Sequence, residues 1–227
     1  MIGLGISGSV SRSFAGWRLA LLVVEGVQTR LAGTELEAEL ERVETALKAR
    51  FGSRSRKELA LLEPMRAYAE YFATSGKAYP VLLQVESIAS KGRRLATPDP
   101  LVGAMFAAEL EGQLLTAGHD LDALRPPLAL RLASGTELMP TFGGGDKAPP
   151  EGDLVMRDAA GIVASVLLGP DSRTCISPRS SRLLFAVYAP PAVSAARIES
   201  QLERLFGLAA LACPGARRGE SSVVELG

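Results

Sequence analysis

The sequence predicts an α+β protein with a helical first half and a strand-rich second half. Three observations support this class: a dense apolar run near the start, amphipathic helical patterns up to Thr116, and short apolar runs separated by Gly- and Pro-rich connections after Gly118. Helices followed by strands, without strict alternation, are typical of α+β rather than doubly wound folds. With 227 residues, 47% of them apolar, the chain is long enough for one contiguous core. We therefore expect a single domain over residues 1–227.

The first half contains one predicted strand and four predicted helices. Trp17 to Val27 is a short, dense apolar run that closes at Gly26, which is typical of a buried strand. Thr34 and Glu37 have the spacing of a capping box, so we expect a helix to begin there. The other three helices show apolar residues at helical spacing and are expected over Pro64 to Gly76, Pro80 to Ser90, and Asp99 to Leu114.

The second half is predicted to be mostly strands. His119 to Leu124 is expected to form a one-turn helix capped by an aspartate, and Asp158 to Gly161 a hairpin turn between two strands. The strand candidates are Leu128 to Leu132, Asp153 to Arg157, Ile162 to Leu168, and Leu183 to Tyr188. A last amphipathic helix is expected over Val193 to Phe206. The core then spans about residues 14–207, and residues 214–227 are expected to be a flexible tail.

Charge and cysteine content restrict the class of protein. Twenty-five basic and twenty-five acidic residues balance, so no net field attracts the protein to nucleic acid or to a membrane. Cys175 and Cys213 lack nearby Cys or His partners, which excludes the usual zinc spacings and a disulfide framework. No metal and no cofactor are therefore predicted. The run from Leu19 to Val24 is far shorter than the ~20 residues that span a bilayer. We expect a cytoplasmic protein without a membrane partner.

His119 and Thr174 are the candidate catalytic residues. His119 is the single histidine, and an imidazole is the usual general base near neutral pH. The alternative is a structural histidine at a helix start. Thr174 ends the loop from Gly169, and its hydroxyl is a candidate for positioning water. We expect the two residues to share one cleft, because both lie in glycine-bounded polar segments next to apolar elements.

The same loop supplies candidate substrate-binding groups. Asp171, Ser172 and Arg173 place a carboxylate, a hydroxyl and a guanidinium next to one another, and a guanidinium matches carboxylate or phosphate groups. A polar β-turn is the alternative interpretation. Arg131 and Glu137 flank a turn at a strand end and are further candidates, with a structural ion pair as the alternative.

Lys91, Arg93 and Arg94 form a local basic cluster. Phosphate contacts dominate RNA affinity, so this cluster is the candidate RNA contact. Solvated surface at a helix end is the alternative.

Five ordered blocks stand out in the second half: residues 117–122 (AGHDLD), 130–138 (LRLASGTEL), 152–158 (GDLVMRD), 169–174 (GPDSRT) and 184–190 (LFAVYAP). Their ordered series resembles the freestanding relatives of the editing domain in the phenylalanyl-tRNA synthetase beta subunit. The resemblance implies an α+β fold with a β-sandwich-like core flanked by helices. It also implies a cleft among these strand-end blocks.

The resemblance implies a stand-alone aminoacyl-tRNA deacylase, an ester hydrolase that acts on mischarged tRNA and needs no metal. Water would attack the ester carbonyl with the help of His119 or Thr174, while Arg131 or Arg173 orients the substrate. The catalytic and anticodon-binding modules of a synthetase are absent from the sequence given, so a ligase activity is not expected. The alternative is a non-catalytic module that binds RNA, an amino acid or a protein. With tRNA as partner, binding is expected to be weak or transient.

Overall fold

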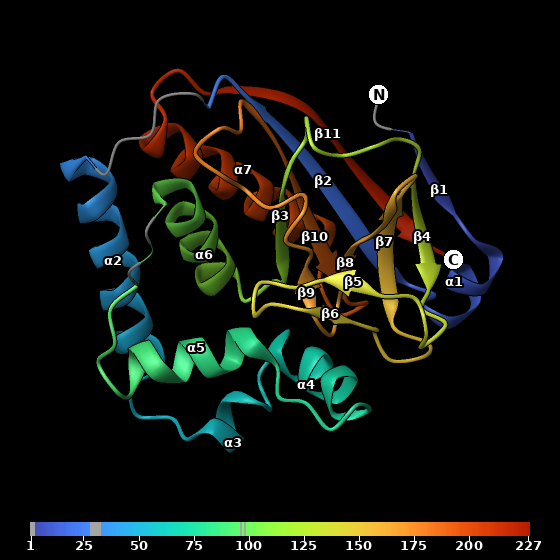
Figure 1. Cartoon of the computed structure of the whole chain (residues 1–227). Helices are drawn as coiled ribbons and strands as arrows, with labels where there is room; N and C mark the ends of the chain where they lie inside the picture. The colour runs from blue at the N-terminus through green and yellow to red at the C-terminus, as the bar shows by residue number, and fades with distance from the viewer. Residues whose placement is uncertain (1–2, 28–32, 96, 98) are drawn as a thin grey trace.

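The computed structural model describes residues 3–27, 33–95, 97 and 99–227. Most of the helices lie in the first half of the chain and most of the strands in the second, which confirms the α+β class (Figure 1). The helices are α1 (Gly8–Ser13), α2 (Thr34–Phe51), α3 (Arg56–Leu59), α4 (Met65–Ala73), α5 (Pro80–Ala89), α6 (Pro100–Gly112) and α7 (Ala195–Ala212). The strands are β1 (Leu4–Ile6), β2 (Trp17–Glu25), β3 (Thr116–Asp120), β4 (Leu128–Leu132), β5 (Met139–Pro140), β6 (Asp146–Lys147), β7 (Leu154–Asp158), β8 (Gly161–Ser165), β9 (Gly169–Pro170), β10 (Arg182–Ala189) and β11 (Arg217–Leu226).

The strands form two main sheets and one small hairpin. The four-stranded sheet has the order β11-β2-β10-β3, with antiparallel neighbours. The five-stranded sheet has the order β1-β4-β7-β8-β9, in which β1 runs parallel to β4 and the other neighbours are antiparallel. β5 and β6 form the separate hairpin. The predicted turn between β7 and β8 is present, and Asp158 Oδ1 accepts a hydrogen bond of 2.8 Å from the N–H of Ala160 within it.

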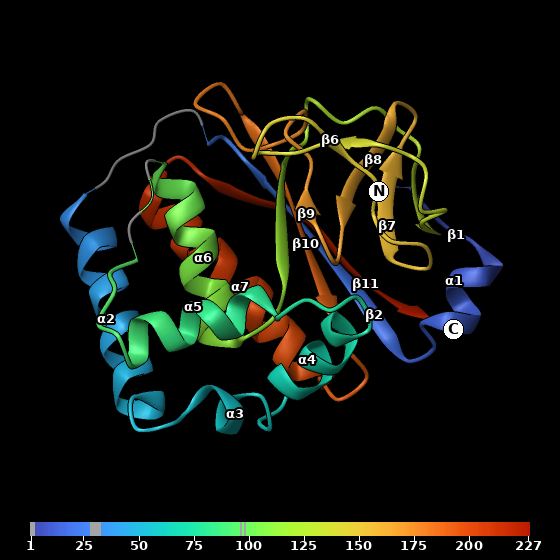
Figure 2. The same ribbon diagram turned by 60° about the horizontal axis from the view of Figure 1, so that its bottom comes forward.

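The four-stranded sheet lies between a helical layer and the five-stranded sheet. Figures 1 and 2 both show α2, α5, α6 and α7 on one side of it and β4 and β7 on the other. The side chains of Leu19, Leu21 and Val23 are at most 5% exposed, and so are those of the residues between them. Because β2 is covered on both faces, it has a continuous apolar sequence rather than alternation.

The helix α6 positions the chain for the site described below. Asp99 caps its N-terminus by accepting a hydrogen bond of 2.9 Å from the N–H of Leu101, and Pro100 occupies the first turn. Gln113 follows the helix in the left-handed region, at φ 53°. Its side chain donates a hydrogen bond of 3.0 Å to the backbone oxygen of Leu110, which holds this turn and directs the chain into β3.

Three local predictions are wrong. His119 lies in β3, paired with Leu184 of β10, and not in a one-turn helix, because buried cross-strand pairing outweighs the local turn signal. The N-cap of α2 is Gly33 without a side-chain cap, so Thr34 makes no capping box. The predicted tail at residues 214–227 is mostly the strand β11, which pairs with β2 along its length.

The elements β1 and α1 were not predicted. β1 extends the five-stranded sheet beside β4, and α1 contacts the same strand. No helix within the described part of the chain is both long enough and apolar enough to cross a membrane.

Candidate functional site

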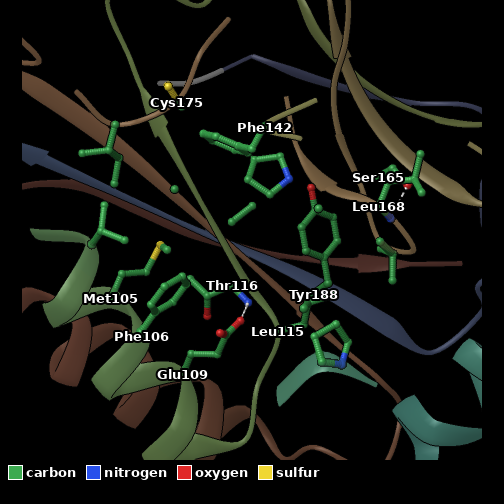
Figure 3. A pocket seen from close by; sticks show the side chains of 18 of the residues that line it. Met105, Phe106, Glu109, Leu115, Thr116, Phe142, Ser165, Leu168, Cys175 and Tyr188 are labelled. Atoms are coloured by element: carbon green, nitrogen blue, oxygen red, sulfur yellow. Dashed lines mark hydrogen bonds between the residues drawn. The ribbon is translucent and has the colours of Figure 1, made fainter. Parts of the chain in front are cut away.

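A cavity of about 480 Å³ lies where the two main sheets approach each other beside α6 (Figure 3). Its walls come from α6, the beginning of β3, the chain from the end of β8 through β9, and β10. Most of these walls are apolar. The described residues that line the cavity include one carboxyl group and no lysine, arginine or histidine. A cavity of this size and polarity is typical of sites for small molecules.

Glu109 supplies the carboxyl group of the cavity. Met105 and Phe106 precede it by four and three residues, respectively, and therefore share its face of α6. The side chain is buried, and Oε1 accepts a hydrogen bond of 2.8 Å from the N–H of Thr116 at the start of β3. Burial raises the pKa of Glu109 to about 8, and the Thr116 N–H opposes this shift only in part. At neutral pH the group is mostly a protonated acid, which can donate a hydrogen bond.

Tyr188 places a second polar group in the cavity. The residue is 2% exposed, and its hydroxyl has no hydrogen-bond partner among the described residues. Burial, and then the charge of Asp153, raise the pKa of Tyr188, so the phenol stays neutral. An unpaired buried hydroxyl costs free energy. A ligand with a polar atom at this position would recover that loss.

Two lining residues stand closer to solvent. Phe142, between β5 and β6, is 64% exposed, and Figure 3 shows it across the cavity from the α6 residues Met105, Phe106 and Glu109. Cys175 is half-buried, and burial raises the pKa of its thiol. The cavity is therefore reachable from one side and carries a thiol that reagents can report on.

The predicted catalytic pair is brought together but does not line this cavity. Nδ1 of His119 lies 2.8 Å from Oγ1 of Thr174, and both residues are fully buried. Thr116, Ala117 and Gly118 at the start of β3 line the cavity, whereas His119 does not. Burial, and then the charge of Arg173, lower the pKa of His119 to about 4. The imidazole is therefore neutral and held inside the protein.

The predicted substrate-binding loop is occupied by internal contacts. Arg173 pairs with Asp158 at 2.9 Å and with Asp171 at 3.4 Å. Asp171 is fully buried and accepts a hydrogen bond of 3.0 Å from the N–H of Thr174. Ser172 donates its backbone N–H to Pro140 at 3.1 Å. These contacts fix the loop that leads from β9 to Cys175.

Arg131 and Glu137, the further substrate-binding candidates, do not form the ion pair that was the alternative interpretation. Glu137 pairs instead with Arg157 of the neighbouring strand β7 at 3.1 Å. Arg131 lies exposed on β4, outside the cavity.

The predicted RNA contacts are exposed near the end of α5. Lys91 lies 3.6 Å from Glu86, and Arg94 pairs with Glu41 and Glu44 at 2.7 Å and 3.1 Å. Arg93 and Arg94 line a smaller hollow that shares two wall residues, Gln84 and Phe106, with the cavity. This basic cluster therefore stands beside the cavity.

Sequence reasoning missed Glu109 and Tyr188. Glu109 lies in a predicted helix and Tyr188 in a predicted strand, and neither was named as a candidate site residue. One signal was available: Glu109 interrupts the apolar stripe of α6 at a position where an apolar residue is expected. Across residues 3–27, 33–95, 97 and 99–227, no three His, Cys, Asp or Glu side chains are arranged to hold a metal ion.

Comparisons with known proteins give a weak similarity of fold. No protein-family model and no curated protein matches the sequence. Among solved structures, the chain is similar to an N-terminal fragment of the phenylalanyl-tRNA synthetase beta subunit from Pyrococcus horikoshii, with 11% identity and a TM-score of 0.49. The match covers 95% of this chain and 50% of that fragment, so the chain spans about half the fragment's length.

Proposed function

We propose that the protein binds a small, largely apolar ligand in the cavity beside α6. The observation that carries this proposal is the pair formed by the carboxyl group of Glu109 and the buried hydroxyl of Tyr188, which has no partner among the described residues, in walls that are mostly apolar. A few placed polar groups in an apolar cavity fix the orientation of a ligand. This arrangement favours the non-catalytic binding module over the hydrolase.

Binding is favoured because none of the described residues that line the cavity is an evident general base. His119 lies outside it, and its lowered pKa makes it a weak proton acceptor. Glu109 lines the cavity, but at neutral pH it is mostly protonated. A general base has to be within hydrogen-bond reach of the substrate and deprotonated at the working pH.

Hydrolysis of an aminoacyl-tRNA ester is the second candidate function. Three of the five blocks that resemble the editing domain contribute to the cavity, through Gly118, Gly169 and Tyr188. The neighbouring hollow with Arg93 and Arg94 offers cations for a phosphate backbone that leads to it. In this case the aminoacyl group would occupy the cavity and the 3′ end of the tRNA the hollow.

The binding proposal is tested by protection of Cys175 from iodoacetamide, with 2-phenylethanol as a neutral apolar probe. The probe should slow alkylation of Cys175, which lines the cavity, and Cys213, which is fully buried, serves as an internal reference. Val102→Trp should fill the cavity and abolish protection, since Val102 lines it. Val223→Trp is the matched control, because Val223 lies exposed on β11. If the rate of Cys175 alkylation is the same with and without 2-phenylethanol, the proposal is contradicted.

The hydrolase is tested by a deacylation screen against charged and mischarged tRNAs. Turnover that Val102→Trp removes and Val223→Trp retains would establish the cavity as an active site. Binding of small probes without turnover of any tRNA leaves the protein a binding module.

A further inference from the structure

The charge pattern of the cavity is one-sided. Glu109 is 4% exposed and supplies the carboxyl group, and no cationic side chain is among the described lining residues. Two cations bond to backbone oxygens in this part of the protein. Lys77 donates to the backbone oxygen of Leu167 at 3.1 Å, and Arg197 donates to the backbone oxygen of Gly112 at 2.8 Å. The fold therefore buries a carboxyl group without a positive partner.

The phenols near Glu109 and the thiol of the cavity are neutral at physiological pH. Tyr68 of α4 and Tyr79 before α5 are fully buried phenols whose pKa values are raised, first by burial and in part by the charge of Glu109. Tyr188 of β10 is a third neutral phenol, and the thiol of Cys175 has a raised pKa. None of these groups neutralises a charge on Glu109.

We propose that this cavity takes an apolar amine, and that among amino-acid derivatives it takes the ester rather than the free amino acid. This inference rests on the proposed binding function. An ammonium group would supply the positive charge that Glu109 lacks, and a buried charge is tolerated when it is paired. Aromatic faces of Phe106 and Phe142 line the same space, and such faces attract cations. A free amino acid also carries a carboxylate, which would be buried near Glu109 without a cation.

Binding of an ammonium ligand should release one proton. Glu109 is protonated in the free protein and becomes a carboxylate when it pairs with the ammonium group, so its proton passes to solvent. The pKa of Glu109, raised to about 8 by burial, sets the range of this linkage. Below about pH 8, affinity for the amine should rise about tenfold per pH unit, and above it the dependence on Glu109 disappears.

The test compares five phenyl compounds by calorimetric titration: 2-phenylethylamine, phenylalanine methyl ester, phenylalanine, 3-phenylpropanoate and neutral 2-phenylethanol. The amine and the ester should bind at least about tenfold more tightly than the two carboxylates. Glu109→Gln should remove this preference and the pH dependence while binding of 2-phenylethanol remains detectable. The glutamine keeps an acceptor oxygen for the N–H of Thr116, and retained 2-phenylethanol binding shows that the variant is folded. Glu111→Gln on the same helix is the matched control, since Glu111 does not line the cavity.

The outcomes separate the inference from the proposed function. If 2-phenylethanol binds, and the two carboxylates bind as tightly as the amine and the ester or more tightly, the amine proposal is overturned and the binding function stands. Unchanged amine affinity in Glu109→Gln also overturns it. If none of the five compounds binds, the binding function itself is rejected.

Discussion

The hydroxyl group of Tyr68 donates a hydrogen bond of 2.5 Å to the backbone oxygen of Tyr188 and accepts one of 3.2 Å from the N–H of Leu115. One side chain of α4 therefore joins the end of β10 to the chain that enters β3. Leu115 and Tyr188 both line the cavity. The phenol of Tyr68 thus reinforces the junction of two cavity walls, where the N–H of Tyr188 also donates a hydrogen bond of 3.0 Å to the backbone oxygen of Leu115.

Removing this phenol should destabilise the protein. We expect Tyr68→Phe to lower the free energy of unfolding by about 1–3 kcal/mol, because two buried backbone groups lose their partner. Tyr188→Phe is the matched control: its hydroxyl has no partner among the described residues, so its removal should cost little. Urea unfolding can be followed by the fluorescence of Trp17, whose ring lies 6.1 Å from that of Tyr68. Equal losses in both variants would contradict the assignment.

His119 should act as a structural residue. We expect His119→Ala to lower the free energy of unfolding by roughly 2–4 kcal/mol, since it removes a buried hydrogen bond to Thr174 and leaves a cavity. The folded-state pKa of about 4 lies below the ordinary 6.5. As the pH drops, His119 therefore takes up its proton at a higher pH in the unfolded chain than in the folded protein. The free energy of unfolding of the wild type should fall as the pH drops from 6.5 towards 4. His119→Ala should lack this component. An unchanged melting temperature together with loss of ester hydrolysis would instead establish a catalytic role.

Glu109 should give the opposite slope at higher pH. Its folded-state pKa of about 8 lies above the ordinary 4.5, so the folded state binds the extra proton. Its contribution is complete below pH 4.5 and is lost as the pH rises through about 8. Between pH 6.5 and 8, above the titration of His119, stability should fall by about 1.4 kcal/mol per pH unit. The slope should vanish in Glu109→Gln and persist in Glu111→Gln, as measured by urea unfolding across this range.

The basic cluster gives a prediction for RNA. If tRNA binds across the hollow beside α5, Arg93→Ala should weaken binding and reduce the slope of log K against log salt by about 0.7. Arg94 is not used, because its removal would leave the buried carboxylate of Glu44 without its ion-pair partner. Arg179→Ala is the control, since Arg179 is exposed and lies outside the hollow. Filter binding over a salt series measures both variants. If the two variants have equal slopes, the cluster is solvated surface and not an RNA contact.

The elements that were predicted from the sequence have strong local signals. β2 is a continuous apolar run, α6 has Asp99 and Pro100 at its start, and the turn at Asp158 has its own side-chain hydrogen bond. β11 has no such signal. It is an edge strand with one neighbouring strand, and most of its exposed side chains are Arg, Glu and Ser. Its sequence therefore lacks the continuous apolar run of a buried strand.

The candidate site was harder to predict because it is assembled from distant segments. Glu109, Gly169 and Tyr188 meet only after both sheets have packed against α6. Sequence reasoning correctly expected His119 to lie near Thr174. It did not anticipate that the pair is fully buried and does not line the cavity.

The position of β2 has a consequence for synthesis on the ribosome. Its two neighbours, β10 and β11, are translated more than 150 residues later, since β2 ends at Glu25 and β10 begins at Arg182. A nascent chain therefore carries an apolar segment, Leu19 to Val24, whose strand partners do not yet exist. Long-range pairing of this kind is slow and exposes aggregation-prone surface. Chaperone demand during translation should accordingly last until Leu226 has left the exit tunnel, and ribosome-bound chains that stop before Arg217 should be protease-sensitive.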